Sequence, residues 1–384
     1  MSMSTFIEIR PVGTLAAPPD RARGSELLTL VRDAGYLQRD PRYYAGRIAA
    51  DLTLLVGGWA AFVLVGRSWW QVLVAAWLGI AFTHIGFLGH DAGHRQVFRS
   101  RRGNDALGIL AANLAIGLSF GWWVDKHRRH HLNPNHVGLD PDIDNKMVSF
   151  YPKPARRRGR IARLVVRHQV AVICIALPLQ AFVLHVKSVQ FLVRGGGRHR
   201  GPECLALALF ALGYAGLVAA VLDPVHAVVF VLVQQGVFGT YFALVVAPNH
   251  KGMPIVHGSP RTDFVWRQAA TARNVDGGRV VDYLFGGLNH QIEHHLFPSM
   301  PRRSLRRVRP LVRDFCRANE IPYTHTSLLS TYRQAFGYLH QVARLENAAR
   351  PENGVPADQR GVAATSPARS SASPLTSVSH SSRT

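Results

Sequence analysis

Histidines in this chain gather in three short clusters that share one spacing. They are His90-Asp-Ala-Gly-His94, His127-Arg-Arg-His130-His131 and His290-Gln291-Ile-Glu-His294-His295. Residues three or four apart lie on one face of an α-helix, so each cluster presents its side chains in one direction. Imidazole suits iron, zinc, copper and nickel as a ligand. The clusters therefore predict one metal site that distant segments of the chain build together.

The number of ligands indicates more than one metal ion. The first cluster offers two histidines, the second three, and the third two or three ligands. A single zinc ion takes at most four ligands, so this surplus predicts two ions of a redox metal. The third cluster is ambiguous, because His290 is the better ligand whereas Gln291 matches the spacing of the second cluster. Either residue could join His294 and His295.

Other polar residues can complete or orient the site. Ala247-Pro-Asn249-His250 ends the last apolar run, where we expect His250 to reach the metals and Asn249 to hold a bound water. Carboxylates that accept hydrogen bonds from ring N–H groups orient metal-bound histidines. Such carboxylates occur at Asp91, at Glu293 and in the acidic stretch Asp140-Pro-Asp142-Ile-Asp144.

Long apolar segments must position these clusters. Several runs are long enough, or nearly so, to cross a hydrocarbon layer about 30 Å thick. They cover residues 49–66, 69–89, 105–124, 164–186, 204–222 and 225–247. The chain is therefore predicted to be an all-α integral membrane protein.

A single site requires all three clusters on the same side of the membrane. The first two runs form a hairpin that ends at His90, and the last two form a hairpin that ends before His250. The run 105–124 separates the first two clusters, so we expect it to be re-entrant or interfacial. The run 164–186 is assigned to the interface, because it carries polar residues. The prediction is four transmembrane helices in two hairpins, with interfacial helices and a cytosolic helical cap that holds the metals.

The net charge of +22 comes mainly from basic residues that lie beside the apolar runs. This pattern is typical of cytoplasmic loops that contact anionic headgroups. No nucleic-acid recognition motif accompanies it, so nucleic acid is not an expected partner. We expect a multi-pass protein of the cell (inner) membrane with its active site on the cytoplasmic face. Residues 1–42 are predicted to be a cytosolic segment, residues 43–345 the membrane domain, and residues 346–384 a disordered tail.

The motifs, in this order, resemble the membrane fatty acid desaturase family over residues 43–340. The context of the second cluster, Trp122-Trp123-Val-Asp-Lys-His127, is similar to that family's. Two further segments resemble its bacterial and front-end members. They are Ala247-Pro-Asn-His-Lys-Gly-Met-Pro254 and Gly287-Leu-Asn-His-Gln-Ile-Glu-His-His-Leu-Phe-Pro298.

The resemblance implies an O₂-dependent oxidoreductase of fatty acid metabolism that introduces a carbon–carbon double bond into an acyl chain at two iron ions. In the front-end pattern Gln291 replaces the first histidine of the third cluster, which favours Gln291 as the ligand. The ligands implied at matching positions are His90, His94, His127, His130, His131, His250, Gln291, His294 and His295. Weaker or outer candidates are Asn249, His290, Asp91, Asp144 and Glu293. No catalytic residue beyond the metal ligands is expected.

The family also implies partners. The substrate would be an acyl-CoA or an acyl-lipid, held in membrane lipid. Front-end desaturases often carry a fused cytochrome b5 domain with a His-Pro-Gly-Gly motif, which does not occur in this sequence. The expected electron donor is therefore a separate ferredoxin or flavoprotein reductase.

Three other activities are compatible with parts of the pattern. His290-Gln-Ile-Glu293-His294 matches the H-x-x-E-H motif of membrane zinc metallopeptidases, with Glu293 as general base, but this leaves two clusters unused. A metal transporter would place its ligands at mid-depth in the membrane, whereas these clusters follow the apolar runs. Hydroxylation or epoxidation of an acyl chain would use the same iron centre as desaturation.

Overall fold

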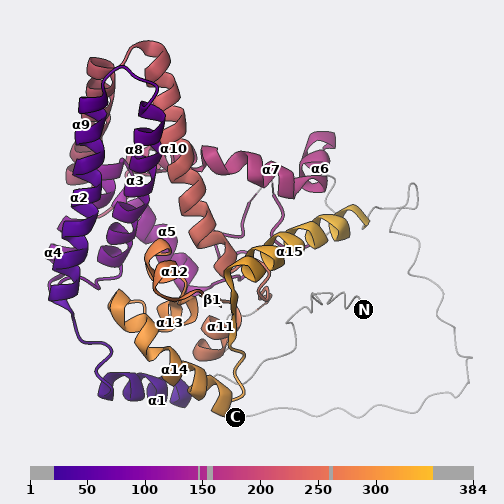
Figure 1. The fold of residues 1–384 in the computed structure, drawn as a ribbon. Helices are drawn as coiled ribbons and strands as arrows, with labels where there is room; N and C mark the ends of the chain where they lie inside the picture. The colour runs from indigo at the N-terminus through magenta and orange to yellow at the C-terminus, as the bar shows by residue number, and fades with distance from the viewer. Residues whose placement is uncertain (1–20, 146–147, 154–158, 259–262, 349–384) are drawn as a thin grey trace, which may run out of the picture.

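The computed structural model describes residues 21–145, 148–153, 159–258 and 263–348. The elements, in chain order, are α1 (Arg21–Asp33), α2 (Pro41–Val65), α3 (Gln71–Gly93), α4 (Arg101–Gly108), the π-helix η1 (Ile109–Ala115), α5 (Phe120–Leu132), α6 (Arg160–Arg167), α7 (Gln169–Ala176), η2 (Leu177–Leu179), α8 (Gln180–Val193), α9 (Arg200–Val221), α10 (Pro224–Val246), η3 (Ala247–Asn249), α11 (Phe264–Ala270), β1 (Arg273–Asp276), α12 (Gly278–Leu284), α13 (Gln291–Leu296), α14 (Arg302–Ala318), β2 (Thr324–Ser327) and α15 (Leu328–Ala348). Long helices α2, α3, α9 and α10 extend toward one end of the molecule, and α1, α11, α13 and α14 gather at the other (Figure 1).

Five helical segments are long and apolar enough to cross a membrane. They are Pro41–Val65, Gln71–Gly93, Gln169–Val193, Arg200–Val221 and Pro224–Asn249. The segment Gln71–Gly93, which is α3, lies at the centre of this group, with 67% of its most apolar window buried, against 6% for α9. Apolar side chains on the outer helices are exposed, including Leu64 at 85% and Leu212 at 74%. Such continuous apolar surface indicates contact with lipid rather than with water.

Capping residues fix where two of these helices begin. The Asp40 carboxylate accepts a hydrogen bond from the Tyr43 backbone amide at the start of α2. The Asp223 carboxylate caps α10 in the same way, and a proline follows each of the two caps. Side-chain oxygens at this position satisfy amides that the first helical turn leaves unpaired, and proline fits the first turn. The connection from Val65 to Gln71 between α2 and α3 and that from Val221 to Pro224 between α9 and α10 are both short, as the two hairpins require.

The apolar run 105–124 does not form one straight helix. Its two parts, Arg101–Ala115 and Phe120–Leu132, meet at an angle of 114°. Gly117 in the break has a φ of 71°, a left-handed conformation that glycine adopts without steric cost. The Ser119 hydroxyl then accepts a hydrogen bond from the Trp122 amide and starts α5. The segment has the shape of a re-entrant loop.

The described structure departs from an all-α fold at one place. Strands β1 and β2 form a two-stranded parallel sheet in which Arg273 pairs with Thr324 and Asp276 pairs with Ser327. The strands have only four residues each and lie in the part of the chain that follows α10. So short a pair is stabilised by its surroundings rather than by its own sequence. The sequence of these residues therefore contains no pattern that predicts a strand.

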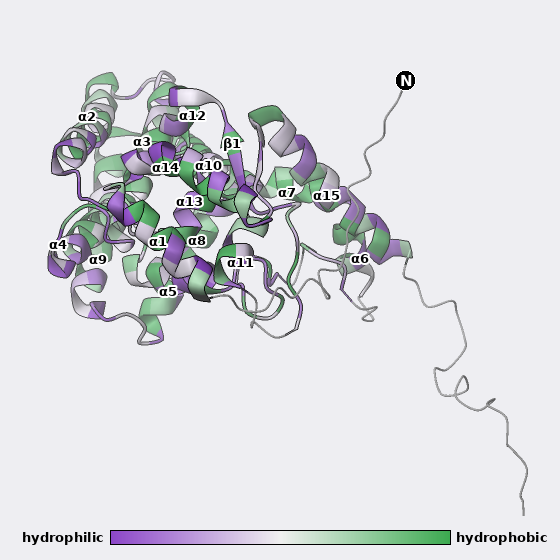
Figure 2. Ribbon diagram, turned by 90° about the horizontal axis from the view of Figure 1, so that it is seen from below, coloured by the Kyte–Doolittle hydropathy of each residue, from purple (hydrophilic) through white to green (hydrophobic). Residues whose placement is uncertain are grey.

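The helical cap includes the N-terminal helix. Leu27 and Val31 of α1 are buried in one apolar cluster with Val265 of α11 and Val308 of α14. Residues 21–33 of the predicted N-terminal segment are therefore an integral part of the cap. At the other end, α15 continues through Ala348, so the first three residues of the predicted disordered tail (346–348) are helical. Residues 349–384 lie outside the described residues. Helices α6 and α15 carry polar and apolar residues in alternation (Figure 2).

Candidate metal centre

The three histidine clusters meet at the junction of the long helices and the cap. His90 lies in the last turn of α3 and His94 is its C-cap residue. The second cluster occupies the last two turns of α5, His250 follows η3, and α13 carries the third cluster. The structure thus brings together histidines from four separate segments, as their spacing predicted.

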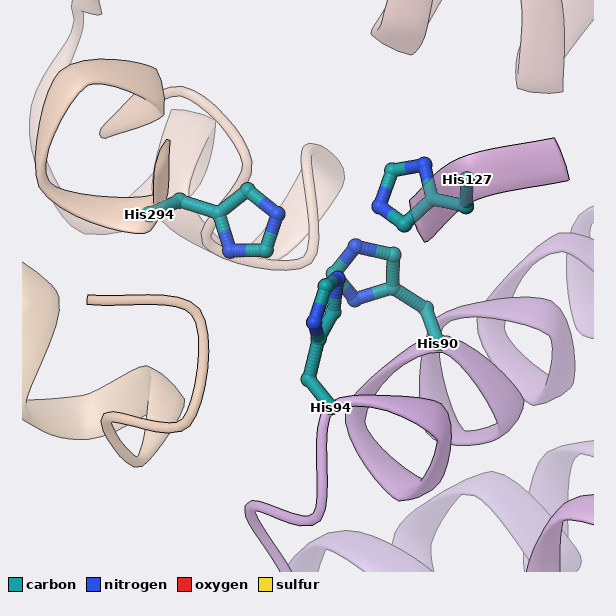
Figure 3. Close-up of side chains that lie close together, drawn as sticks. All are labelled: His90, His94, His127 and His294. Atoms are coloured by element: carbon teal, nitrogen blue, oxygen red, sulfur yellow. The ribbon is translucent and has the colours of Figure 1, made fainter. Parts of the chain in front are cut away.

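Four histidines form a first group. One nitrogen from each of the rings of His90, His94, His127 and His294 lies within 4.8 Å of the corresponding atoms of the other three. Figure 3 shows the four rings turned toward one another from three segments of the chain. The Nε2 atoms of His90 and His94 and both ring nitrogens of His294 are buried without a hydrogen-bond partner among the described residues. Each unsatisfied buried polar atom costs about 1–3 kcal/mol, so this convergent group could hold a metal ion.

A second group consists of His130, His250 and His295. The Nε2 atom of His250 lies 3.3 Å from Nε2 of His130 and 3.1 Å from Nε2 of His295. The opposite nitrogen of each ring faces a hydrogen-bond acceptor at 2.9–3.0 Å. These acceptors are a carboxylate oxygen of Asp140, the backbone oxygen of Thr271 and the side-chain oxygen of Gln268.

These acceptors determine which nitrogen carries the proton. A neutral imidazole has a single N–H, and in each ring the acceptor takes it at Nδ1. The Nε2 lone pair of His250 therefore meets those of His130 and His295 at 3.3 and 3.1 Å. Lone pairs at this separation repel unless a cation lies between them. The second group thus fits a metal ion by its hydrogen bonds as well as by its ligand type.

His131 and Gln291 lie beside these groups. The Nε2 atom of His131 is 3.0 Å from Nε2 of His127, and the ring of His131 stacks on that of His295 with centroids 4.2 Å apart. His131 therefore lies between the two groups. The side-chain amide of Gln291 is 3.0 Å from Nε2 of His250. The amide nitrogen faces His250, because the Gln291 oxygen accepts a hydrogen bond from the Asn249 amide at 3.2 Å. Gln291 therefore lies beside the second group, and its role as a ligand stays a prediction.

Burial keeps the rings neutral. Burial, together with the neighbouring His130 ring, lowers the pKa of His250 to about 3. Burial likewise lowers the pKa values of His294 and His295 far below the usual range. A neutral imidazole is the form that coordinates a metal. The site is therefore ready to bind cations without first losing protons at neutral pH.

One acidic residue of the stretch 140–144 supports a ligand directly. Both carboxylate oxygens of Asp140 lie 3.0–3.1 Å from Nδ1 of His130, and Asp140 is buried. Burial acts to raise the pKa of Asp140, but the His130 ring outweighs it, so the pKa is lowered. Asp144 is exposed, so the outer role that we predicted for Asp144 belongs to Asp140. The reason is the turn after His136, which folds Asp140 back onto α5.

We expect Asp140→Asn to lower metal affinity and activity about 10- to 100-fold, because a neutral amide is a weaker acceptor for the His130 N–H than a carboxylate. Asp144→Asn is the matched control and should leave both unchanged. Bound metal per polypeptide and turnover in detergent are the measurements. Equal metal content and equal turnover in the two variants would show that Asp140 does not orient His130.

His290 does not join either group. Its Nε2 atom lies 3.0 Å from a carboxylate oxygen of Asp282. The carboxylate of Glu293 accepts hydrogen bonds from the Tyr323 hydroxyl at 2.5 Å and from the Asn274 amide at 2.8 Å, and therefore contacts no ligand ring through the described hydrogen bonds. Since His290, Glu293 and His294 do not converge, the metallopeptidase interpretation loses its support. Glu293 instead fixes α13 against β1.

Asn249 lies beside Gln291. Its amide donates to the Gln291 side-chain oxygen at 3.2 Å and to the backbone oxygen of Leu288 at 3.1 Å. Its own side-chain oxygen is buried without a partner among the described residues. Asn249 and His294 line the same cavity. The water-holding role of Asn249 stays a prediction.

Asp91 connects the first group to the cap. One Asp91 oxygen lies 3.4 Å from Nδ1 of His90, and the other lies 2.7 Å from the guanidinium of Arg302 at the start of α14. Tyr44 donates a hydrogen bond to the same carboxylate from α2. The side chains of Arg302 and Asp91 are only 5% and 3% exposed. This buried ion pair joins α2, α3 and α14 directly behind a predicted ligand.

Arg302→Met should destabilise the protein by about 3–5 kcal/mol, because it leaves the Asp91 charge buried without its partner. Arg303→Met is the matched control, since Arg303 is 49% exposed in its pair with Asp40, and should cost at most about 1 kcal/mol. Thermal unfolding in detergent compares them. Similar unfolding temperatures for the two variants would contradict the prediction.

An apolar cavity leads away from the first group. His90, His127 and His294 line one part of it, and Gly86, Leu184 and Phe238 line another. Phe238 of α10 and Asn249 of η3 both line the cavity. At a rise of 1.5 Å per residue, their positions are about 16 Å apart along the helix axis. The only charged pair among its walls is Lys126 with Asp142. The cavity is therefore suited to an extended apolar chain that passes the metal ligands.

Some residues that orient the histidine rings could not be identified from the sequence. Gln268 of α11 orients His295, and its amide also donates to the backbone oxygen of His131 at 2.9 Å. The backbone of Thr271 orients His250. Trp123 stacks on His127 with ring centroids 4.4 Å apart. Gln268 and Thr271 lie in a segment without any histidine cluster, and only the tertiary fold brings them to the metals.

Comparison with known proteins agrees with these features. The family model for fatty acid desaturases matches residues 67–327. A Delta(5) fatty acid desaturase of Caenorhabditis elegans is 30% identical over 78% of this chain and 69% of its own length. Delta(8)-fatty-acid desaturases of Euglena gracilis and Helianthus annuus are 33% and 31% identical, over 75% and 72% of this chain.

These relatives are longer than this chain. The matched region spans 71% of the Euglena enzyme and 63% of the Helianthus enzyme, or about two thirds of each relative. The match nevertheless contains all three histidine clusters and the segment around His250. Family model, relatives and the geometry of the histidines lead to one conclusion: the chain belongs to the fatty acid desaturase family, whose members are oxidoreductases that act on fatty acyl chains.

Proposed function

We propose that this protein is an O₂-dependent fatty acyl desaturase with a histidine-ligated di-iron centre. The observation that carries the proposal is the convergence of two groups of imidazoles beside one apolar cavity. The first iron would be held by His90, His94, His127 and His294, and the second by His130, His250 and His295. His131 lies between the groups, and Gln291 completes the second.

Iron bound there would supply the oxidising power to convert a CH₂–CH₂ pair, O₂, two electrons and two protons into CH=CH and two waters. The protein's own residues hold the chain in place. A methylene group has no acidic proton or basic atom on which acid–base catalysis could act. The position of the double bond therefore depends on which carbons the cavity places beside the ligands. Apolar walls at Gly86, Leu184 and Phe238 exclude water from this region and leave the chain no polar partner.

We propose that four helices cross the membrane, in the hairpins α2–α3 and α9–α10. By composition the segment Gln169–Val193 could be a fifth. An odd number of crossings between His131 and His294 would separate the clusters, and α7 runs across the direction of the long helices in Figure 1. Both observations support an interfacial position for α7 and α8. The basic residues of α14 then lie on the cytoplasmic face of the inner membrane.

The substrate would be an acyl-CoA or an acyl-lipid, whose chain enters from the membrane side of the cap. Two electrons per turnover would come from a ferredoxin or flavoprotein reductase. Helix α14 contains seven arginines and one aspartate, and this excess of positive charge on the cap suits an acidic donor. These assignments follow from the chemistry that the centre requires.

The test is to produce the full chain beside a ferredoxin and its reductase and to locate new double bonds in cell lipids by gas chromatography and mass spectrometry. His294→Ala serves as the inactive control. A new unsaturated fatty acid in the wild type alone is the expected result. New hydroxy or epoxy acids would instead assign a sister oxidation, and purified protein with one zinc ion and no iron would overturn the proposal.

A further inference from the structure

The turn between η1 and α5 forms part of the cavity wall. Ile116 and Leu118 of the turn line the cavity, as do Phe120 and Trp122 at the start of α5. The same helix continues to His127 and His130. The shape of this turn therefore determines both the space available to an acyl chain and the direction in which α5 presents the second cluster.

A buried carboxylate holds the turn from outside the cavity. Glu203 of α9 is 1% exposed, and one of its oxygens accepts three hydrogen bonds. The donors are the Ser119 hydroxyl at 2.7 Å, the Gly121 amide at 3.0 Å and the Asn113 side-chain amide at 3.3 Å. Asn113 in turn accepts a hydrogen bond from the Phe120 amide at 3.0 Å.

The position of Gly121 shows how closely the carboxylate approaches the turn. A Cβ atom on Gly121 would lie 2.5 Å from the other oxygen of Glu203. Glycine at this position therefore lets the carboxylate reach the backbone amide. A Cβ atom on Gly117 would lie 2.2 Å from the Phe210 ring of α9. The turn thus packs against α9 at two points, through one polar and one apolar contact.

His185 of α8 holds the turn from a second side. Its Nδ1 atom lies 2.8 Å from the backbone oxygen of Gly117, and its Nε2 atom lies 3.1 Å from the side chain of Gln235 on α10. Neither His185 nor Glu203 lines the cavity, whereas Leu184, next to His185, does. Both residues therefore act on the cavity through the turn that they hold.

A buried carboxylate in an apolar bundle is costly unless several donors surround it. Apolar packing would be the less demanding way to join α9 to its neighbours. The hydrogen bonds instead fix individual backbone groups of the turn, at the amide of Gly121 and the carbonyl of Gly117. A cavity wall that selects one position along a uniform acyl chain needs backbone groups that are fixed in this way.

We propose that Glu203 and His185 are positioning residues that determine where the acyl chain stops in the cavity, and hence which carbons are oxidised. This inference rests on the proposed desaturase activity. It assigns specificity to two side chains that do not touch the substrate, through the turn formed by residues 116–121.

The variants Glu203→Gln and His185→Ala test this assignment in the full-length protein beside the same electron donors. Double-bond positions and chain lengths of the products are measured by mass spectrometry, together with iron per polypeptide. We expect both variants to retain iron and to lower the ratio of the main product isomer to its neighbours by about tenfold, which corresponds to about 1.4 kcal/mol between competing positions. Ser119→Ala removes one donor to Glu203 and the N-cap of α5, and it should shift the ratio in the same direction.

His226→Ala is the matched control. His226 also pairs with a carboxylate, Asp223, but in the turn between α9 and α10, and it is not part of the cavity wall. Its product ratio should equal that of the wild type. An unchanged ratio in iron-loaded Glu203→Gln, His185→Ala and Ser119→Ala proteins would overturn the inference while leaving the desaturase activity intact. A wild type without any desaturated product would overturn the proposed function, and this inference with it.

Discussion

His250→Ala should abolish desaturation and remove about one iron ion per polypeptide. His250 holds the centre of the second group, with its Nε2 atom 3.1–3.3 Å from those of His130 and His295. Loss of an outer partner of a ligand typically costs 10- to 100-fold in metal affinity or activity, so loss of a ligand should cost more than about 100-fold. Iron per polypeptide and the formation of product measure the two effects separately.

His94→Ala should remove about one iron ion as well, but from the first group. The double variant of His94 and His250 should then bind almost no iron, because each group would have lost one ligand. His290→Ala is the matched control, since its ring faces Asp282 rather than the metals. It should retain both ions and most of the activity. A loss of iron from His290→Ala equal to that from His250→Ala would show that the third cluster binds metal through His290.

The spacing of the histidines predicted that the clusters would converge but not how they would be divided. His294 and His295 are adjacent on α13, and adjacent residues point about 100° apart around a helix. His294 therefore faces the first group and His295 the second. His127 and His130 of α5 are three residues apart, about 60° around the helix, and they also belong to different groups. Which histidine of one cluster shares a metal with which histidine of another depends on the packing of α3, α5 and α13, which the sequence pattern does not contain.

The ambiguity between His290 and Gln291 has a local physical cause. Helix α13 begins at Gln291, and His290 is its N-cap residue with φ −98° and ψ 58°. Helical spacing from His290 to His294 therefore does not apply, and the side chain of His290 points to Asp282 instead. Ligand quality favoured His290, whereas the boundary of the helix places Gln291 beside His250. The sequence alone does not fix that boundary to within one residue.

Parts of the fold could be predicted from the length of the apolar runs or from the requirement for an even number of membrane crossings between the clusters. The hairpins and the bend in the run 105–124 follow from the requirement that the clusters share one side. The helix α1 in the cap and the strands β1 and β2 could not be anticipated, because they are stabilised by contacts with segments far away in the chain. The segment Gln169–Val193 is apolar enough to span by composition, so the proposed interfacial position of α7 and α8 follows from parity and not from hydropathy.

Gly86→Leu should block long acyl chains while leaving the iron centre intact. Gly86 lines the cavity about one helical turn from His90, and a Cβ atom there would meet the Ile116 side chain at an ordinary contact distance of 3.7 Å. The backbone therefore accepts a side chain, but the rest of a leucine must occupy the space of the substrate. A displacement of about 1 Å from the productive position can cost about 100-fold in rate. We expect kcat/KM for the natural chain length to fall by about that factor, with shorter chains affected less.

The matched control for this substitution is Gly213→Leu. Gly213 is exposed on α9, and a Cβ atom there meets nothing within 4 Å. The control therefore adds the same side chain to the same kind of helix on the surface that faces lipid. Iron content should equal that of the wild type in both variants, and only Gly86→Leu should change the dependence of turnover on chain length. If both variants kept the wild-type preference, the cavity beside His90 would not be the path of the acyl chain, and the carbons that react would have to approach the irons from another side of α3.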